Sequence, residues 1–133
     1  MPYSSIIDEK SIDYTKGFNA MEIVGQQVTL GEIARMAERT FGNMVKAVID
    51  VDREILAVDG ELHSDLEALL IENGSQQRNL WGINLYPEMD GDDFIEFDSM
   101  INMRPSQGNR SRGVESADVR EAIVRIVAKR IAR

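Results

Sequence analysis

The sequence contains no cysteine and only one histidine, His63. The lack of thiols excludes a disulfide framework, a thiolate metal site and a cysteine nucleophile. Only 3 prolines occur in 133 residues, so no proline-rich segment is present. No apolar run approaches the roughly 18 residues that span a bilayer, and the N-terminus lacks the basic and apolar regions of a secretory signal. We therefore expect a cytoplasmic protein with no membrane segment.

Positive charge is scarce in most of the chain and concentrated at its end. Residues 1–103 carry 7 Lys and Arg against 20 Asp and Glu, whereas residues 104–133 carry 8 against 3. The basic segment either binds phosphate or nucleic acid, or packs against the acidic body and neutralises it. We favour the second interpretation, because a net charge of −8 repels a long polyanion and argues against nucleic acid as a partner.

The length predicts one domain over residues 21–133, preceded by a polar extension over residues 1–20 that lacks a clear period. A helix is expected after Thr29, because Thr29 and Glu32 have the spacing of a capping box. Gly42-Asn43 should end this helix, since both residues tolerate the left-handed conformation. Ser116 is expected to cap a second helix, which runs to the C-terminus with basic residues in its last turn.

Between these helices the pattern favours strands. Residues 44–51 alternate apolar and polar side chains, residues 55–58 form a second apolar run, and residues 94–104 alternate strictly. The expected fold class is α+β: a mostly antiparallel meander sheet of about five strands, with the N-terminal and C-terminal helices packed on one face.

Residues 64–73 are compatible with two structures. Ser64 and Glu67 have capping-box spacing before LEALL, which is good helix material. Asn73-Gly74 between two apolar runs is also a strong hairpin signal, which pairs residues 64–73 with 75–86 as antiparallel strands. We prefer the hairpin here and keep the helix as the alternative.

His63 lies in the stretch DGELHSDLEA, which is the first candidate site. If residues 61–65 are extended, Glu61, His63 and Asp65 share one face. An imidazole between two carboxylates suits a general base, with His63 and Asp65 as catalytic residues, or a divalent metal site formed by all three. Zinc normally needs more His or Cys ligands, so Mg²⁺ or Mn²⁺ fits better. The simpler interpretation is a structural histidine that balances two acids, and a metal cofactor is not favoured.

The loop MRPSQGNRSRG is the second candidate site, because guanidinium groups and free backbone N–H groups suit a carboxylate or phosphate. The alternative is a polar connector whose arginines pair with the acidic body. A polar patch on the uncovered sheet face would lie beside this loop. The predicted ligand-binding residues of the loop and the patch are Arg104, Gln107, Asn109, Arg110, Ser111, Asn84 and Asn102.

Trp81, Ile83 and Leu85 share a face of the strand NLWGINLY and are expected to be core residues. Gly82 in the middle of this strand is unexpected, because glycine weakens a strand. A bulge or a close backbone approach would explain it.

Three patterns resemble a small prokaryotic family that is classified as a domain of unknown function. They are LHSD at residues 62–65, NLWG at residues 79–82 and INMRPSQGNRS at residues 101–111. The resemblance covers about residues 21–130 and leaves the first twenty residues outside. It implies a single-domain bacterial or archaeal protein of cytosolic type, and it supplies no activity, cofactor or catalytic residue.

Two hypotheses for the function follow. The first is a small binding or interaction domain for an anionic ligand that carries phosphate or carboxylate. This hypothesis is compatible with a homo-oligomer. The second is a metal-dependent or histidine-based hydrolase or lyase that uses Glu61, His63 and Asp65, with Arg104 and Arg110 holding the substrate. The second requires the acidic trio and the arginine loop to converge on one place. We favour the first hypothesis because it does not require the single histidine to carry out catalysis.

Overall fold

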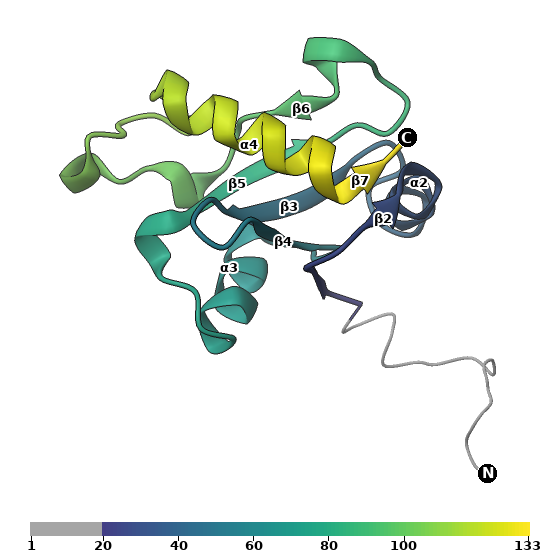
Figure 1. Ribbon diagram of the computed structural model, residues 1–133, viewed down its shortest axis with the longest axis horizontal. Helices are drawn as coiled ribbons and strands as arrows, with labels where there is room; N and C mark the ends of the chain where they lie inside the picture. Colours follow the sequence, from purple (N-terminus) through teal and green to yellow (C-terminus); the bar gives the residue numbers. More distant parts are fainter. Residues whose placement is uncertain (1–19) are drawn as a thin grey trace, which may run out of the picture.

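The computed structural model describes residues 20–133, and nearly all of the predicted N-terminal extension lies outside them. The main sheet is antiparallel and has five strands in the order β1-β4-β3-β5-β6, which confirms the predicted α+β class. Helices lie on both sides of this sheet (Figure 1). The strands of the sheet are β1 (Glu22–Val24), β3 (Val45–Asp50), β4 (Ile55–Val58), β5 (Leu80–Leu85) and β6 (Ile95–Glu96).

The N-terminal helix α2 (Leu30–Arg39) begins where the sequence predicts. Thr29 Oγ1 accepts from the Glu32 N–H at 3.1 Å, and Glu32 Oε1 accepts from the Thr29 N–H at 2.9 Å, which completes the capping box. At the other end, Gly42 is left-handed with φ +94°, and its N–H donates to Ala37 O. Ile33, Met36 and Ala37 form the buried face of this helix.

The predicted strand over residues 64–73 is wrong, because these residues lie in helix α3 (His63–Glu72). Asn73-Gly74 closes this helix instead of a hairpin. Gly74, at φ +103°, donates its N–H to Ile71 O, and the Ser75 N–H donates to Leu70 O. This is the Schellman pattern, which needs the same left-handed glycine that a hairpin turn needs. The helical alternative was therefore the correct one, although the N-cap is Leu62 and not Ser64.

Helix α3 connects β4 to β5, and β3 lies between these two strands in the sheet. Both flanking strands run antiparallel to β3, so β4–α3–β5 is a split β-α-β unit. The strands therefore do not form the plain meander that the sequence suggested. Strand β1 occupies the edge beside β4 and completes the five strands.

The predicted long strand over residues 94–104 is also wrong. Only Ile95–Glu96 is a strand, and two 3-10 turns follow, η3 (Met100–Asn102) and η4 (Pro105–Gln107). Ser99 starts the first turn, because its Oγ accepts from the Ile101 N–H at 3.2 Å. The buried side chain of Asn102 then occupies the place beside β5 where a longer β6 would have paired.

The C-terminal helix α4 (Ala117–Arg130) starts at the predicted cap Ser116. It ends in β7 (Ile131–Ala132), which pairs in parallel with β2 (Val28–Thr29) and so connects the two ends of the described chain. The basic side chains of this segment pair with the acidic body, as we favoured from the charge pattern. The pairs are Arg125 and Lys129 with Glu54, and Arg133 with Asp90.

Two apolar clusters cover the two faces of the sheet. Helices α2 and α4 pack together on one face, as predicted, against alternate residues of β3, β4 and β5 that include Trp81, Ile83 and Leu85. Helix α3 covers part of the other face through Leu66 and Leu70, which pack on Val48, Ala57 and Leu80. Beyond the reach of α3, the same face carries Lys46, Asn84 and Glu96 in cross-strand register. These positions border the site described below.

Candidate functional site

His63 is the first residue of α3 and is buried against β5, with 8% of its surface exposed. Its Nε2 lies 2.8 Å from the carbonyl oxygen of Ile83. Because a carbonyl can only accept, Nε2 must carry the proton and donate it. In the neutral ring this leaves Nδ1 as an acceptor, and Nδ1 has no hydrogen bond within residues 20–133.

The pKa of His63 is lowered from its ordinary value of 6.5, chiefly because burial penalises the charged ring. The hydrogen bond to Ile83 and the charge of Asp98 act in the opposite direction, while Lys46 and Arg112 lower the pKa further. The imidazole is therefore neutral at pH 7, with its tautomer fixed by the Ile83 carbonyl.

A cavity of about 190 Å³ opens beside this imidazole. Lys46 of β3 and Arg112 of the loop before α4 bring two positive charges to it, and Ser64 and Ser99 bring two hydroxyl groups. Arg112 Nε pairs with Asp98 Oδ1 at 2.6 Å, which orients the guanidinium group. The remaining lining residues are Leu62, His63, Met100 and Ile101.

The N-terminal end of α3 faces the same cavity, because Leu62, His63 and Ser64 all line it. Leu62 is the N-cap and makes no capping hydrogen bond through its side chain. The N–H groups of His63 and Ser64 have no hydrogen-bond partner in the described part of the chain. A helix N-terminus with unpaired N–H groups carries partial positive charge, which adds to the charge of Lys46 and Arg112.

Gly82 of β5 lies against two lining residues of the cavity, Ser99 and His63. A Cβ atom at Gly82 would lie 2.6 Å from both Cβ and Oγ of Ser99 and 3.2 Å from Cδ2 of His63. Only glycine allows this approach, which confirms the prediction of a close backbone contact at this position.

The Asn102 side chain fixes the backbone at Gly82 and at Arg112. Its Oδ1 accepts from the Gly82 N–H at 2.8 Å, and its Nδ2 donates to Gly82 O at 3.0 Å and to Arg112 O at 2.9 Å. The amide therefore replaces a strand partner for β5 and fixes the backbone of Arg112. This side chain is a structural element of the site and has no free group for a ligand.

The predicted trio of Glu61, His63 and Asp65 does not share one face. The extended backbone that it required is absent, because α3 begins at His63. Glu61 and Asp65 are exposed and do not line the cavity. Within residues 20–133 no group of three or more His, Cys, Asp or Glu side chains is placed to hold a metal ion. The metal site therefore has no geometric basis, and a catalytic role for His63 and Asp65 stays a prediction.

In the loop at residues 103–113, Arg104 and Asn109 already have hydrogen-bond partners within the protein. Arg104 donates to the carbonyl oxygens of Gln77 and Leu80 at 2.6 and 2.7 Å and stacks on Trp81 at 4.1 Å. Asn109 is buried, and its Nδ2 donates to the backbone carbonyls of Ser111 and Gly113 in the loop and of Asn102 before it. These residues support the loop through backbone carbonyls and the Trp81 ring, whereas the connector alternative expected its arginines to pair with carboxylates.

The other predicted residues of the loop make weaker contacts. Gln107 reaches Arg78 O at 3.4 Å, and Ser111 Oγ accepts from the Gly113 N–H at 3.2 Å. Arg110 is exposed and lies outside the cavity that Arg112 lines. The arginines predicted to hold a substrate, Arg104 and Arg110, therefore do not converge on His63.

Asn84 is buried, so the exposed patch that was predicted for Asn84 and Asn102 is not formed. Asn84 Nδ2 donates to Glu96 Oε1 at 2.9 Å, and its Oδ1 is buried without a partner in the described residues. Cross-strand pairing places Asn84 between Lys46 and Glu96. It therefore marks the boundary between the basic cavity and an acidic one.

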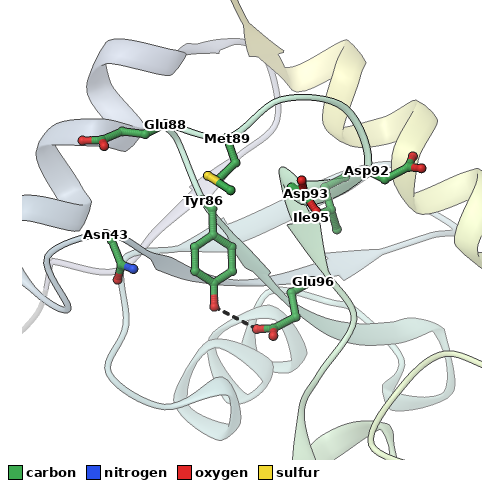
Figure 2. Close-up of a pocket in the computed structure, with 8 residues that line it drawn as sticks. All are labelled: Asn43, Tyr86, Glu88, Met89, Asp92, Asp93, Ile95 and Glu96. Carbon is green, nitrogen blue, oxygen red and sulfur yellow. Dashed lines mark hydrogen bonds between the residues drawn. The ribbon is translucent and has the colours of Figure 1, made fainter.

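The acidic cavity has a volume of about 490 Å³ and lies around Tyr86. Figure 2 shows the Tyr86 hydroxyl pointing at Glu96, to which it donates at 3.0 Å. Burial and the Glu96 carboxylate raise the pKa of Tyr86. The other lining residues are Asn43, Glu88, Met89, Asp92, Asp93 and Ile95, none of which is a cation. The carboxylates that line this cavity disfavour an anion in it.

A comparison with protein-family models matches residues 22–130 to a family described as Protein of unknown function (DUF5674). The chain belongs to the DUF5674 family. Neither the comparison with curated proteins nor the comparison with solved structures found a match. In this DUF5674 chain, no helix of the described residues is long and apolar enough to cross a membrane.

Sequence reasoning found only His63 of the polar residues that line the basic cavity of this DUF5674 protein. It missed Lys46, Ser64 and Ser99, and it named the loop that contains Arg112 without singling out that residue; the four come from separate segments. Gly82 was the available signal, because a glycine within a strand indicates that something approaches the backbone there. The identity of the approaching residue, Ser99, depends on the turn at η3 and is not readable from a local pattern.

The lowered pKa of His63 makes the stability of this protein depend on pH. Neutral His63 is favoured in the folded state, so its contribution is fully present above pH 6.5, the ordinary pKa, and is lost as pH falls through the lower folded-state pKa. As pH falls below 6.5, we expect the unfolding free energy of the wild type to decrease relative to that of His63→Gln, because glutamine does not titrate. Urea unfolding from pH 7.5 downward measures it, and a pH-independent difference would contradict the assignment.

Proposed function

We propose that this protein binds a small anionic ligand, a phosphate or carboxylate group, in the His63 cavity. The observation that carries the proposal is the pair of cations, Lys46 and Arg112, at a cavity that also presents the N-terminus of α3. Lys46 forms no salt bridge with a carboxylate of residues 20–133; its Nζ lies 5.3 Å from the centre of the Phe41 ring. Its charge is therefore available to a ligand.

The donors around the cavity suit an anion with several acceptor oxygens. Ser64 and Ser99 supply hydroxyl groups, and the first turn of α3 supplies backbone N–H groups. Charge-assisted hydrogen bonds from Lys46 and Arg112 are stronger than neutral ones. A volume of about 190 Å³ fits one such group, and the net charge of −8 disfavours a long polyanion.

The test is titration of inorganic phosphate at pH 7.5, followed by the ring proton signals of His63, which is the only histidine. We expect saturable shifts of these signals. Arg112→Gln should raise the Kd about tenfold, the loss expected for one charge-assisted hydrogen bond. A wild-type protein whose His63 signals do not move would refute the proposal.

Arg110→Gln is the matched control, because Arg110 belongs to the same loop but does not line the cavity. Both variants remove one positive charge, so a general charge effect would weaken binding equally. Equal losses of affinity in the two variants would argue against the His63 cavity and favour a site in the loop around Arg104 and Arg110. A loss confined to Arg112→Gln supports the His63 cavity.

A histidine-based hydrolase or lyase is the second candidate. It is favoured by one observation: His63 is neutral, its Nε2–H is fixed by Ile83, and its other ring nitrogen is free to accept a proton. No hydrogen bond joins His63 to Ser64 or Ser99 in the described residues, so a Ser-His nucleophile lacks its defining contact. Turnover of a phosphate or carboxylate ester that disappears in His63→Gln, with phosphate binding retained, would favour the enzyme.

A further inference from the structure

We infer that the ligand of the His63 cavity is an amphiphilic anion, in which the anionic group carries a short apolar chain. This inference rests on the proposed function, because it concerns the same cavity. It is carried by two apolar side chains at the cavity, Leu62 and Met100, which the anion-binding groups do not explain.

Leu62 and Met100 are 56% and 63% exposed, the two highest values among the exposed large apolar side chains of residues 20–133. They come from separate segments, the N-cap of α3 and the start of η3, and both line the cavity. Single exposed apolar residues are ordinary on protein surfaces. Two of them beside the same charged cavity form an apolar border next to its cations.

The identity of Leu62 is also costly to the fold. An N-cap position favours Ser, Thr, Asp or Asn, and an apolar residue there destabilises the helix. Leu62 leaves the first N–H groups of α3 uncapped while exposing its own side chain. Both consequences suit a ligand whose anionic group takes the place of the missing cap and whose chain lies on Leu62.

The size of the cavity determines which part of the ligand is enclosed. About 190 Å³ beside Lys46, Arg112 and His63 equals the liquid volume of about six waters, which accommodates a carboxylate or phosphate group and the first few carbons of a chain. A longer chain extends over the border of the cavity, where half-buried Ile101 and exposed Leu62 and Met100 line it. The apolar contact is therefore partial and favours a short chain.

The experiment compares n-alkyl carboxylates from acetate to hexanoate, with n-alkyl phosphates as a parallel series. The charge of the head group is constant within each series, so the dependence on chain length isolates the apolar contact. Full burial of one methylene strengthens binding by about fourfold, so we expect a two- to fourfold decrease in Kd per methylene over the first few. The series that binds more tightly identifies the head group.

The variants Leu62→Ala and Met100→Ser supply the specific readout, because alanine at position 62 removes the apolar chain without adding an oxygen that could cap α3 in place of the anion. Each should flatten the dependence on chain length, while the Kd of inorganic phosphate changes less than twofold because the cationic groups are unchanged. Met103→Ser is the matched control, since Met103 is 44% exposed but does not line the cavity, and it should keep the wild-type dependence.

The outcomes separate the two proposals. Phosphate binding with no dependence on chain length would overturn the amphiphilic ligand and leave the anion site intact. The absence of any binding would overturn both. A dimer in sedimentation that dissociates in Leu62→Ala or Met100→Ser would also overturn the inference, because a second copy would then cover these side chains.

Discussion

Asn102→Ala should lower the free energy of unfolding by about 3–5 kcal/mol, the upper range for one substitution. The side chain is fully buried and makes three hydrogen bonds to backbone groups, two to Gly82 and one to Arg112. Each buried polar group that loses its partner costs about 1–3 kcal/mol. Urea unfolding followed by the fluorescence of Trp81, the only tryptophan, measures the loss.

Asn73→Ala is the matched control for this prediction. Asn73 also donates through its side chain to a backbone carbonyl, Leu69 O at 2.8 Å, but it is exposed to water. Its removal should cost less than about 1 kcal/mol, because water can replace the lost partner. Similar losses in the two variants would show that the Asn102 amide does not hold β5 to the loop.

Gly82→Ala should destabilise the protein by about 2–3 kcal/mol through overpacking. The added Cβ would lie 2.6 Å from two atoms of Ser99, which real structures do not tolerate. Ser99 cannot retreat easily, because it is 1% exposed and its N–H donates to Arg112 O at 2.9 Å. The expected result is a lower midpoint of urea unfolding and a changed environment for the imidazole of His63.

Two further variants make the Gly82 prediction specific. Gly82→Ala combined with Ser99→Gly removes both crowded atoms of Ser99, so the double variant should lose less stability than the sum of the single losses. Gly31→Ala, in helix α2 where the new Cβ meets only ordinary contacts, should instead be neutral or stabilising by up to about 1 kcal/mol. A Gly82→Ala protein as stable as wild type would mean that Ser99 does not approach the strand this closely.

Elements whose sequence signals lie within a few neighbouring residues were predicted correctly. The capping box at Thr29, the cap at Ser116 and the alternation in β3 each involve neighbouring residues, and each forms the expected element. Asn73-Gly74 failed as a signal because a hairpin turn and a Schellman cap both place glycine at positive φ. The local sequence could not choose between them, since the choice depends on whether Leu66 and Leu70 can pack on Val48 and Ala57.

The candidate site was predicted only in part. His63 and Gly82 stood out as single residues of unusual type for their surroundings; His63 lines the cavity, and Gly82 lies against His63 and Ser99, which line it. Arg104 and Asn109 looked like ligand donors, but they donate to backbone carbonyls. A side-chain donor reads the same in sequence whether its partner is a ligand or a distant carbonyl, so the pattern could not separate the two roles.

The sequence by itself determined the fold class, the two capped outer helices, the apolar face of the central strands and the exclusion of cysteine chemistry, because these depend on composition and on neighbours along the chain. Only the tertiary structure decided that residues 63–72 form a helix on the second face and that Lys46 and Arg112 meet at His63. The physical reason is sequence separation. These contacts join segments tens of residues apart, and their free energy exists only once the sheet has brought the segments together.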